Sequence, residues 1–122
     1  MNSRDLGALA EDIAASYLRL TGHEVLARGY VFRGKELDIV ARSGGRILFV
    51  EVKFRRTTAR GLPREAVDAR KMRHIAFAAQ GYLSERRLSA APCRFDVVEI
   101  MLAPGGLALS VRHIPGAFGL NW

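Results

Sequence analysis

Two segments of the chain carry apolar residues at the three- and four-residue spacing of an amphipathic helix. The first helix is expected over residues 5 to 21, capped by Asp5 or Ser3 and ended by Thr21-Gly22. The second is expected over residues 64 to 86, with a break allowed near residues 67 and 68. The two apolar stripes are Leu6, Ala10, Ile13, Ala14, Tyr17 and Leu18, and Met72, Ile75, Ala76, Ala79, Tyr82 and Leu83.

The remaining segments alternate apolar and polar residues, the pattern of β-strands. Strands are expected over residues 24 to 30, on both sides of a turn at 43 to 46, over 93 to 101 and over 107 to 114, with a further turn at 31 to 35. The expected order is therefore α-β-β-β-α-β-β. A sheet with helices packed against it is an α+β fold, or loosely α/β.

The hairpin over residues 34 to 56 organises the chain. Gly44-Gly45 suits a two-residue turn, in which both residues need a positive φ, and a symmetric four-residue loop gives the same register. Counting outward gives the facing pairs Ser43–Arg46, Val40–Phe49, Asp38–Glu51 and Glu36–Lys53. Because side chains alternate along a strand, one face is expected to carry Glu36, Asp38, Glu51 and Lys53, and the other Leu37, Ile39, Val50 and Val52.

This register places the carboxylates of Asp38 and Glu51 opposite each other, which is destabilising unless a positive charge lies between them. A divalent cation with a preference for oxygen ligands, Mg²⁺ or Mn²⁺, fits that place. Lys53 lies on the same face and could orient or help deprotonate an attacking water. Two acids and a lysine around a metal suit the hydrolysis of phosphodiesters. The alternative is a polar face that meets solvent, with Asp38 paired to a nearby arginine.

Composition points to a polyanionic partner. The chain has 122 residues, which fits a single domain over 1–122, and a formal net charge of +7. Nucleic acid, DNA more than RNA, is the leading partner, with an anionic membrane surface second. A single cysteine, Cys93, excludes an internal disulfide and fits a reducing compartment. With neither a secretory signal nor a membrane-spanning run in the sequence, we expect a cytoplasmic protein.

Basic residues are concentrated after the hairpin, against only Glu65 and Asp68. A run of positively charged residues next to a candidate phosphate-cleaving centre suggests contacts with a nucleic-acid backbone. A solvated charged surface is the alternative. The residues expected to bind nucleic acid are Arg55, Arg56, Arg60, Arg64, Arg70, Lys71 and Arg73. Lys71 lies on the flank of the second helix, from where it could face the site.

Three further features are ambiguous. Glu11 borders the apolar stripe of the first helix, either as an exposed acid or as a third acid leaning over the sheet, and Gly7 one turn earlier is expected to let another element approach. Asp96 beside Arg94 is either a structural ion pair, which we favour, or a support for the site. The aromatic residues Phe118 and Trp122 either pack back on the sheet or serve a partner.

Several motifs in the chain resemble those of one known family. The motifs Gly7-x-x-x-Glu11, Gly34-x-Glu36-Leu37-Asp38, Phe49-Val50-Glu51-Val52-Lys53-x-Arg55, Lys71, Arg94-Phe95-Asp96 and Ile114-x-x-Ala117-Phe118 are similar to those of the YraN family of small bacterial proteins. That family resembles the PD-(D/E)XK nucleases, particularly the archaeal Holliday-junction resolvases. The resemblance implies a restriction-endonuclease-like fold, with a mixed central sheet flanked by helices.

The resemblance also implies roles for residues. Asp38 and Glu51 would hold Mg²⁺ with the Val52 carbonyl as a further ligand, Lys53 would lie by the attacking water, and Glu11 would match the helix glutamate of the resolvases. Glu36 belongs to the motif without a clear role, and the resolvases act as dimers, so a homodimer is open.

Three functions are therefore in competition. The first is a metal-dependent endonuclease that hydrolyses phosphodiester bonds of DNA, including branched or otherwise structured DNA. The second is a nucleic-acid-binding module of the same fold that does not cut. The third is an assembly partner that uses the tail from Phe118 to Trp122.

Overall fold

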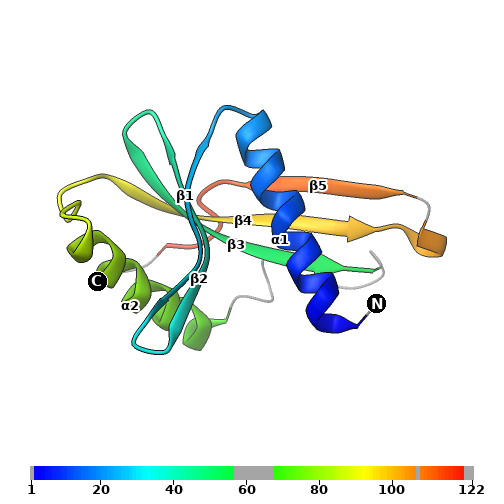
Figure 1. Cartoon of the computed structure of the whole chain (residues 1–122), viewed down its shortest axis with the longest axis horizontal. Helices are drawn as coiled ribbons and strands as arrows, with labels where there is room; N and C mark the ends of the chain where they lie inside the picture. The colour runs from blue at the N-terminus through cyan, green and yellow to red at the C-terminus, as the bar shows by residue number, and fades with distance from the viewer. Residues whose placement is uncertain (1, 57–67, 107, 120–122) are drawn as a thin grey trace.

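The computed structural model describes residues 2–56, 68–106 and 108–119. Five strands form one sheet in the order β1-β2-β3-β4-β5, and two helices pack against it (Figure 1). β3 and β4 are parallel because the chain crosses over through α2 between them, and the other neighbours are antiparallel. The elements are α1 Ser3–Leu20, β1 Glu24–Phe32, β2 Lys35–Ser43, β3 Arg46–Arg55, α2 Ala69–Glu85, β4 Cys93–Leu102, η2 Pro104–Gly106 and β5 Leu109–Ile114.

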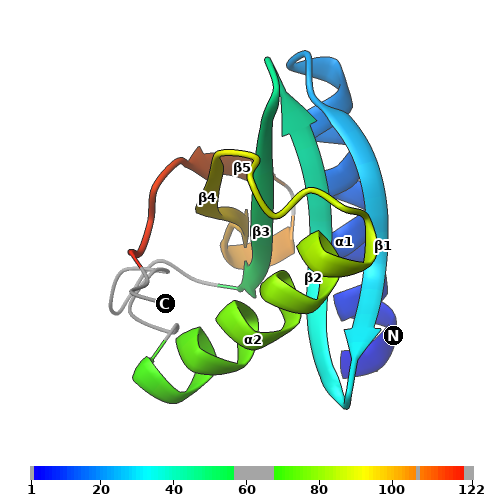
Figure 2. The same cartoon turned by 90° about the vertical axis from the view of Figure 1, so that its left-hand side faces the viewer.

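This arrangement confirms the expected mixed α/β fold with the order α-β-β-β-α-β-β. The two helices cover opposite faces of the sheet (Figure 2). Under α1, Ala14 and Leu18 pack on Ile39 and Leu48. Under α2, Ile75 and Tyr82 belong to the cluster that contains Phe49. The apolar stripes of both helices thus make the two halves of the core.

The ends of several elements differ from the expected ones. β1 continues to Phe32, so the turn is shorter than the expected 31 to 35. The side chain of Asn2, rather than Asp5 or Ser3, caps α1 by accepting a hydrogen bond from the Asp5 N–H at 2.9 Å. Asp68 caps α2. The expected helical residues 64 to 67 lie outside the described part of the chain.

The hairpin turn is confirmed, with Gly44 and Gly45 at φ of 56° and 83°. The expected register is also confirmed from Ser43–Arg46 to Ile39–Val50. Beyond that pair, however, β2 continues against β1 and β3 continues against β4. The sheet divides into two arms at this point, and Figure 1 shows β1 and β2 crossing the direction of β3 and β4. The expected facing pairs Asp38–Glu51 and Glu36–Lys53 are therefore wrong as strand pairs, because the pairing of β2 with β3 ends at Ile39–Val50.

The expected division into one polar and one apolar face is wrong around Asp38. Leu37 packs in the cluster under α2, whereas Ile39 packs in the cluster under α1. Residues two apart on a regular strand share a face, so the alternation breaks at Asp38. The break lies where β2 leaves β3 and continues against β1 alone.

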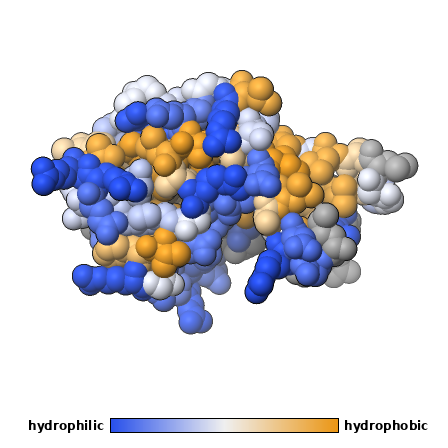
Figure 3. Space-filling view, viewed as in Figure 1, coloured by the Kyte–Doolittle hydropathy of each residue, from blue (hydrophilic) through white to orange (hydrophobic). Residues whose placement is uncertain are grey.

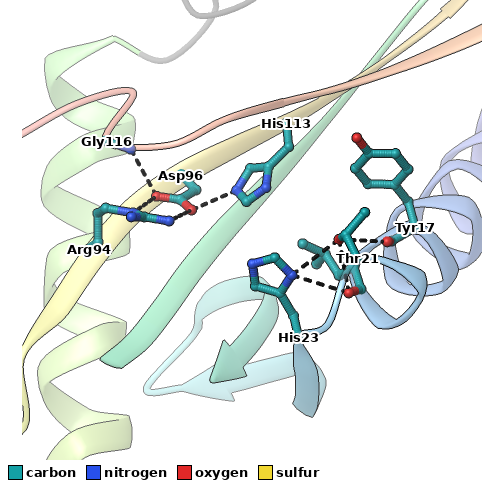
Figure 4. A network of polar contacts seen from close by, with 8 residues as sticks. Tyr17, Thr21, His23, Arg94, Asp96, His113 and Gly116 are labelled. Carbon is teal, nitrogen blue, oxygen red and sulfur yellow. Dashed lines mark hydrogen bonds and ion pairs between the residues drawn. The ribbon is translucent and has the colours of Figure 1, made fainter. Parts of the chain in front are cut away.

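A buried carboxylate ties the C-terminal segment to β4. Asp96, fully buried, accepts two hydrogen bonds from Arg94 at 2.8 and 3.0 Å, contacts His113 Nε2 at 2.7 Å and accepts from the Gly116 N–H at 2.9 Å (Figure 4). Burial alone would raise the pKa of Asp96, but the hydrogen bonds from His113, Arg94 and Gly116 bring it down to about 2. Asp96 therefore has the structural role that we favoured. Phe118 packs on Phe95 at 5.5 Å between ring centroids, so this part of the tail returns to the sheet.

Asp96→Asn is expected to lower the free energy of unfolding at pH 7 by about 2–3 kcal/mol, because it leaves the Arg94 charge without its buried partner. Because the native pKa lies below the ordinary value of 3.8, the stabilisation is present above pH 4 and is lost as the pH falls towards 2. Urea unfolding at pH 7 and pH 3 measures this. The difference from wild type should shrink at pH 3, and a difference independent of pH would contradict the charged role.

Candidate metal and nucleic-acid site

The candidate site lies where β2 and β3 separate. There the Val52 N–H of β3 donates a 2.9 Å hydrogen bond to Asp38 Oδ2. A backbone N–H that loses its strand partner must find another acceptor, and the Asp38 carboxylate supplies it. The same bond holds Asp38 against the edge of β3. Its position is therefore a consequence of how the sheet divides.

Three carboxylates gather on the α1 side of this point. Glu11, Glu36 and Asp38 each place a carboxylate oxygen so that all three lie within 4.8 Å of one another. Burial raises the pKa of Glu11, the Asp38 and Glu36 charges add to the rise, and Arg28 opposes it. Arg28 Nε lies 3.2 Å from Glu11 Oε1. Of the two interpretations of Glu11, its position favours the acid that leans over the sheet.

Glu51 lies on the α2 side of the division and is only 2% exposed. Lys71 of α2 reaches it, with 3.5 Å between Nζ and Oε1. Burial, followed by the nearby Asp38 charge, raises the pKa of Glu51 to about 7, although Lys71 and Lys53 oppose the rise. Lys71 therefore faces the site, which its position on the flank of the helix had left open.

Lys53 is half-buried on β3, close enough to act on the charge of Glu51. Its neighbour in the parallel register is Glu99 of β4, a residue that the sequence analysis did not single out. Glu99 is 4% exposed, and among the described residues its Oε2 atom has no hydrogen-bond partner. Glu99 follows Phe95 and Val97 at alternating positions of the strand, and both of these are buried. An acid on such an apolar face is the feature of the sequence that could have drawn attention to it.

The basic residues of α2 gather around His74, and one of them, Lys71, also reaches Glu51 in the site. Partial burial and then the positive charges of Lys35, Arg70, Lys71 and Arg73 lower the pKa of His74, so these side chains share one electropositive region. Lys35 extends that region to the start of β2. Arg55 and Arg56 lie at the end of β3, and Arg60 and Arg64 lie outside the described residues.

A depression of about 310 Å³ opens Asp38 and Glu11 to solvent on the α1 side. Its other lining residues are Gly7, Ala10, Val52 and Phe54. Within residues 2–56, 68–106 and 108–119, an added Cβ at Gly7 would meet nothing within 4 Å. The expectation that Gly7 admits a neighbouring element is therefore not met by the described residues, and its open side faces the depression.

A fold with a divided mixed sheet and acids gathered at the division defines a small α/β protein with a candidate metal site. Residues 10–100 match the model of the uncharacterised protein family UPF0102, and the chain belongs to that family. This confirms the YraN resemblance.

Relatives in that family match along nearly the whole chain. A UPF0102 protein of Syntrophotalea carbinolica is 48% identical over 116 residues, covering 95% of this chain and 93% of the relative. UPF0102 protein STH1475 of Symbiobacterium thermophilum is 44% identical, over 95% and 98% of the two chains. One from Dictyoglomus turgidum is 38% identical, over 97% and 100%.

Neither helix of the described residues combines the length and apolar character that a membrane crossing requires.

Glu51→Gln is expected to stabilise the metal-free protein at pH 8 by about 2–3 kcal/mol, since it removes a buried charge whose pKa is raised. A raised pKa in the folded state means that wild-type stability falls as the pH rises from about 4.5 through 7. The advantage of the variant should thus vanish near pH 4.5. Urea unfolding in EDTA measures it, with the exposed Glu24→Gln as control. A less stable variant at pH 8 would refute the burial argument.

Proposed function

We propose that this protein is a metal-dependent endonuclease that hydrolyses phosphodiester bonds in DNA. Asp38 and Glu51 are the proposed ligands of Mg²⁺ or Mn²⁺, together with the Val52 carbonyl. Lys53 is the proposed partner of the attacking water, and Glu11 is a third acid at the edge of the site. Glu36 belongs to the acid cluster as a support.

One observation carries the proposal. Glu51 is buried and close enough to the Asp38 charge that its pKa rises to about 7. Two acids held so close destabilise each other unless a cation neutralises them. The fold keeps both of them there, Asp38 through the Val52 N–H and Glu51 through β3. Such an arrangement is typical of functional sites.

The donor set suits a hard cation. All the proposed side-chain ligands are carboxylates, which Mg²⁺ and Mn²⁺ prefer. The N–H and C=O of a strand residue point to the same edge, so the Val52 carbonyl is directed towards Asp38 as its N–H is. A bound divalent ion supplies neutralisation of phosphate charge and a lower pKa of the attacking water.

The chain's own cations complete the proposed chemistry. Lys53, beside Glu51, would hold the attacking water and receive or release its proton. The electropositive region of Lys35, Arg70, Lys71 and Arg73 would hold the backbone of the substrate near the site without reading its sequence. A formal net charge of +7 favours this partner.

The resemblance to the PD-(D/E)XK nucleases supports the same assignment. The matching residues are Asp38, the run Glu51-Val52-Lys53 and Glu11 in the first helix. Fold alone does not establish an activity. The proposal therefore depends on the positions of these side chains.

A second candidate is a nucleic-acid-binding module that does not cut. One observation favours it: three of the acids already have a partner, Arg28 for Glu11, the Val52 N–H for Asp38 and Lys71 for Glu51. In that case these contacts satisfy the carboxylates and no cation is needed. A homodimer is open under either candidate.

Cleavage is tested with the purified chain, Mg²⁺ or Mn²⁺, and labelled branched, nicked and single-stranded DNA. We expect metal-dependent products that fall at least about 100-fold in Asp38→Asn and Lys53→Ala, because each removes a group that acts on the transition state. Glu24→Gln, an exposed acid away from the site, is the matched control. Equal cutting by Asp38→Asn would overturn the proposal.

Metal binding separates the two candidates. Isothermal titration with Mn²⁺ should show one site that Asp38→Asn abolishes and Glu51→Gln weakens at least tenfold, because both carboxylates are ligands. Glu36→Gln should weaken it less. Salt-sensitive DNA binding with no heat from Mn²⁺ would instead support the binding module.

A further inference from the structure

A groove runs along the N-terminal half of α1. The depression at Asp38 and Glu11 adjoins a second one of about 490 Å³, lined by Leu6, Gly7, Phe54 and Arg56. Both depressions are lined by Gly7 and Phe54, so they form one groove, with acids at one end and Arg56 at the other. In Figure 3 the hydrophobic surface beside α1 lies over β4 and β5, and hydrophilic side chains lie towards the N-terminal end of the helix. Each volume is in the range of pockets that take small ligands.

Gly7 is the residue that keeps the groove open. It lies inside α1, where glycine is a poorer helix former than alanine. No packing against the described part of the chain explains it, because none of those atoms lies within 4 Å of the position of a Cβ. The open space in front of Gly7 belongs to the groove. A longer side chain there would fill the groove without touching the core.

Phe54 and Arg56 give the groove its chemistry. Phe54 is half-buried on β3, packed against the core beside α1 with part of its surface in both depressions. Arg56 is exposed at the end of the strand. An aromatic ring beside an arginine suits a nucleotide, since the ring stacks on the base and the guanidinium binds the phosphate.

We propose that this groove binds an unpaired nucleic-acid strand, with a base against Phe54, a phosphate at Arg56, and the backbone leading to Asp38. A base inside a duplex is stacked on both faces and cannot stack on Phe54, so the strand must be single here. This inference rests on the proposed function for its phosphodiester substrate, and adds that cleavage occurs next to an unpaired segment. A deoxyribose or a ribose strand offers the same base and phosphate.

The experiment measures binding in EDTA, where no cleavage can occur, by fluorescence anisotropy. The probes are a labelled twelve-nucleotide oligothymidylate, the same strand in a blunt duplex, and an oligouridylate of equal length. Gly7→Leu should weaken binding of the single strand at least tenfold and that of the duplex less than twofold. Ala8→Leu adds the same bulk to an exposed neighbouring position and should change neither.

Folding is checked separately. Gly7→Ala and Gly7→Leu should raise the Tm by a few degrees, because both replace a helical glycine with a better helix former. Single-strand binding by Gly7→Leu equal to that of wild type, or an equal loss for strand and duplex, would overturn the proposal. A preference for oligothymidylate or for oligouridylate supports the proposal and shows which strand the groove takes, and equal binding shows that it takes both.

Two more variants test the contacts themselves. Phe54→Leu keeps an apolar side chain in the core and should weaken single-strand binding about fivefold or more, whereas Phe54→Trp should keep it and be quenched by the oligonucleotide. Arg56→Gln should lower the salt dependence of log K by about 0.7, the value for one phosphate contact with a single strand. Unchanged affinity in Phe54→Leu would count against stacking.

The outcomes separate this inference from the proposed function. If Gly7→Leu loses single-strand binding and the wild type shows no metal-dependent cleavage, the groove proposal stands and the endonuclease proposal fails. The protein would then be a nucleic-acid-binding module. Metal-dependent cleavage of blunt duplex DNA, unaffected by Gly7→Leu, would keep the endonuclease and refute the groove.

Discussion

The hydrogen bond from the Val52 N–H to Asp38 is the contact on which the candidate site depends. β3 pairs with β4 from Ile47 to Arg55, but its pairing with β2 stops at Val50, where the two arms of the sheet diverge. Val52 keeps its partner Val98 in β4 but has none in β2, and on that side the Asp38 carboxylate accepts the hydrogen bond of its N–H. The fold therefore needs an acceptor at position 38, and an aspartate there serves both the backbone and the site.

The same division of the sheet creates the electrostatic conflict that gives the site its chemistry. One acid cluster forms on the α1 side, around Asp38, and one buried acid, Glu51, lies on the α2 side. The charge of Asp38 acts on both, because it contributes to the raised pKa of Glu11 and to that of Glu51. Burial and then the Asp38 charge raise the pKa of Glu51 to about 7, although Lys71 and Lys53 oppose the rise, and Arg28 opposes the rise at Glu11. Proton uptake or a divalent ion would relieve the remainder.

Local patterns in the sequence were enough for much of the fold. The Gly44-Gly45 turn, the register near it and the apolar stripes of both helices follow from backbone conformation and side-chain spacing. The break at Asp38 could not be predicted in this way, because it depends on how far β2 follows β1 and β3 follows β4, which are non-local contacts. For the same reason Leu37 was assigned to the wrong face.

The candidate site was predictable in its residues and less so in its geometry. Asp38, Glu51 and Lys53 were found by counting outward from the turn. Helix periodicity indicated that Lys71 could face the site, but its contact with Glu51 depends on the tertiary structure. Glu99 was missed because its significance comes from facing Lys53 across a parallel pair, which only the tertiary structure establishes. Gly7 was misinterpreted because sequence alone does not tell whether the space beside a glycine is filled by protein or left open.

The most direct measurement is the anomalous difference map of crystals soaked in Mn²⁺. We predict one peak at the division of the sheet, within ligand distance of carboxylate oxygens of both Asp38 and Glu51. A map with no peak there, or with Mn²⁺ bound by Glu11 and Glu36 and not by Asp38, would contradict the proposed role of the acids that β2 and β3 bring together.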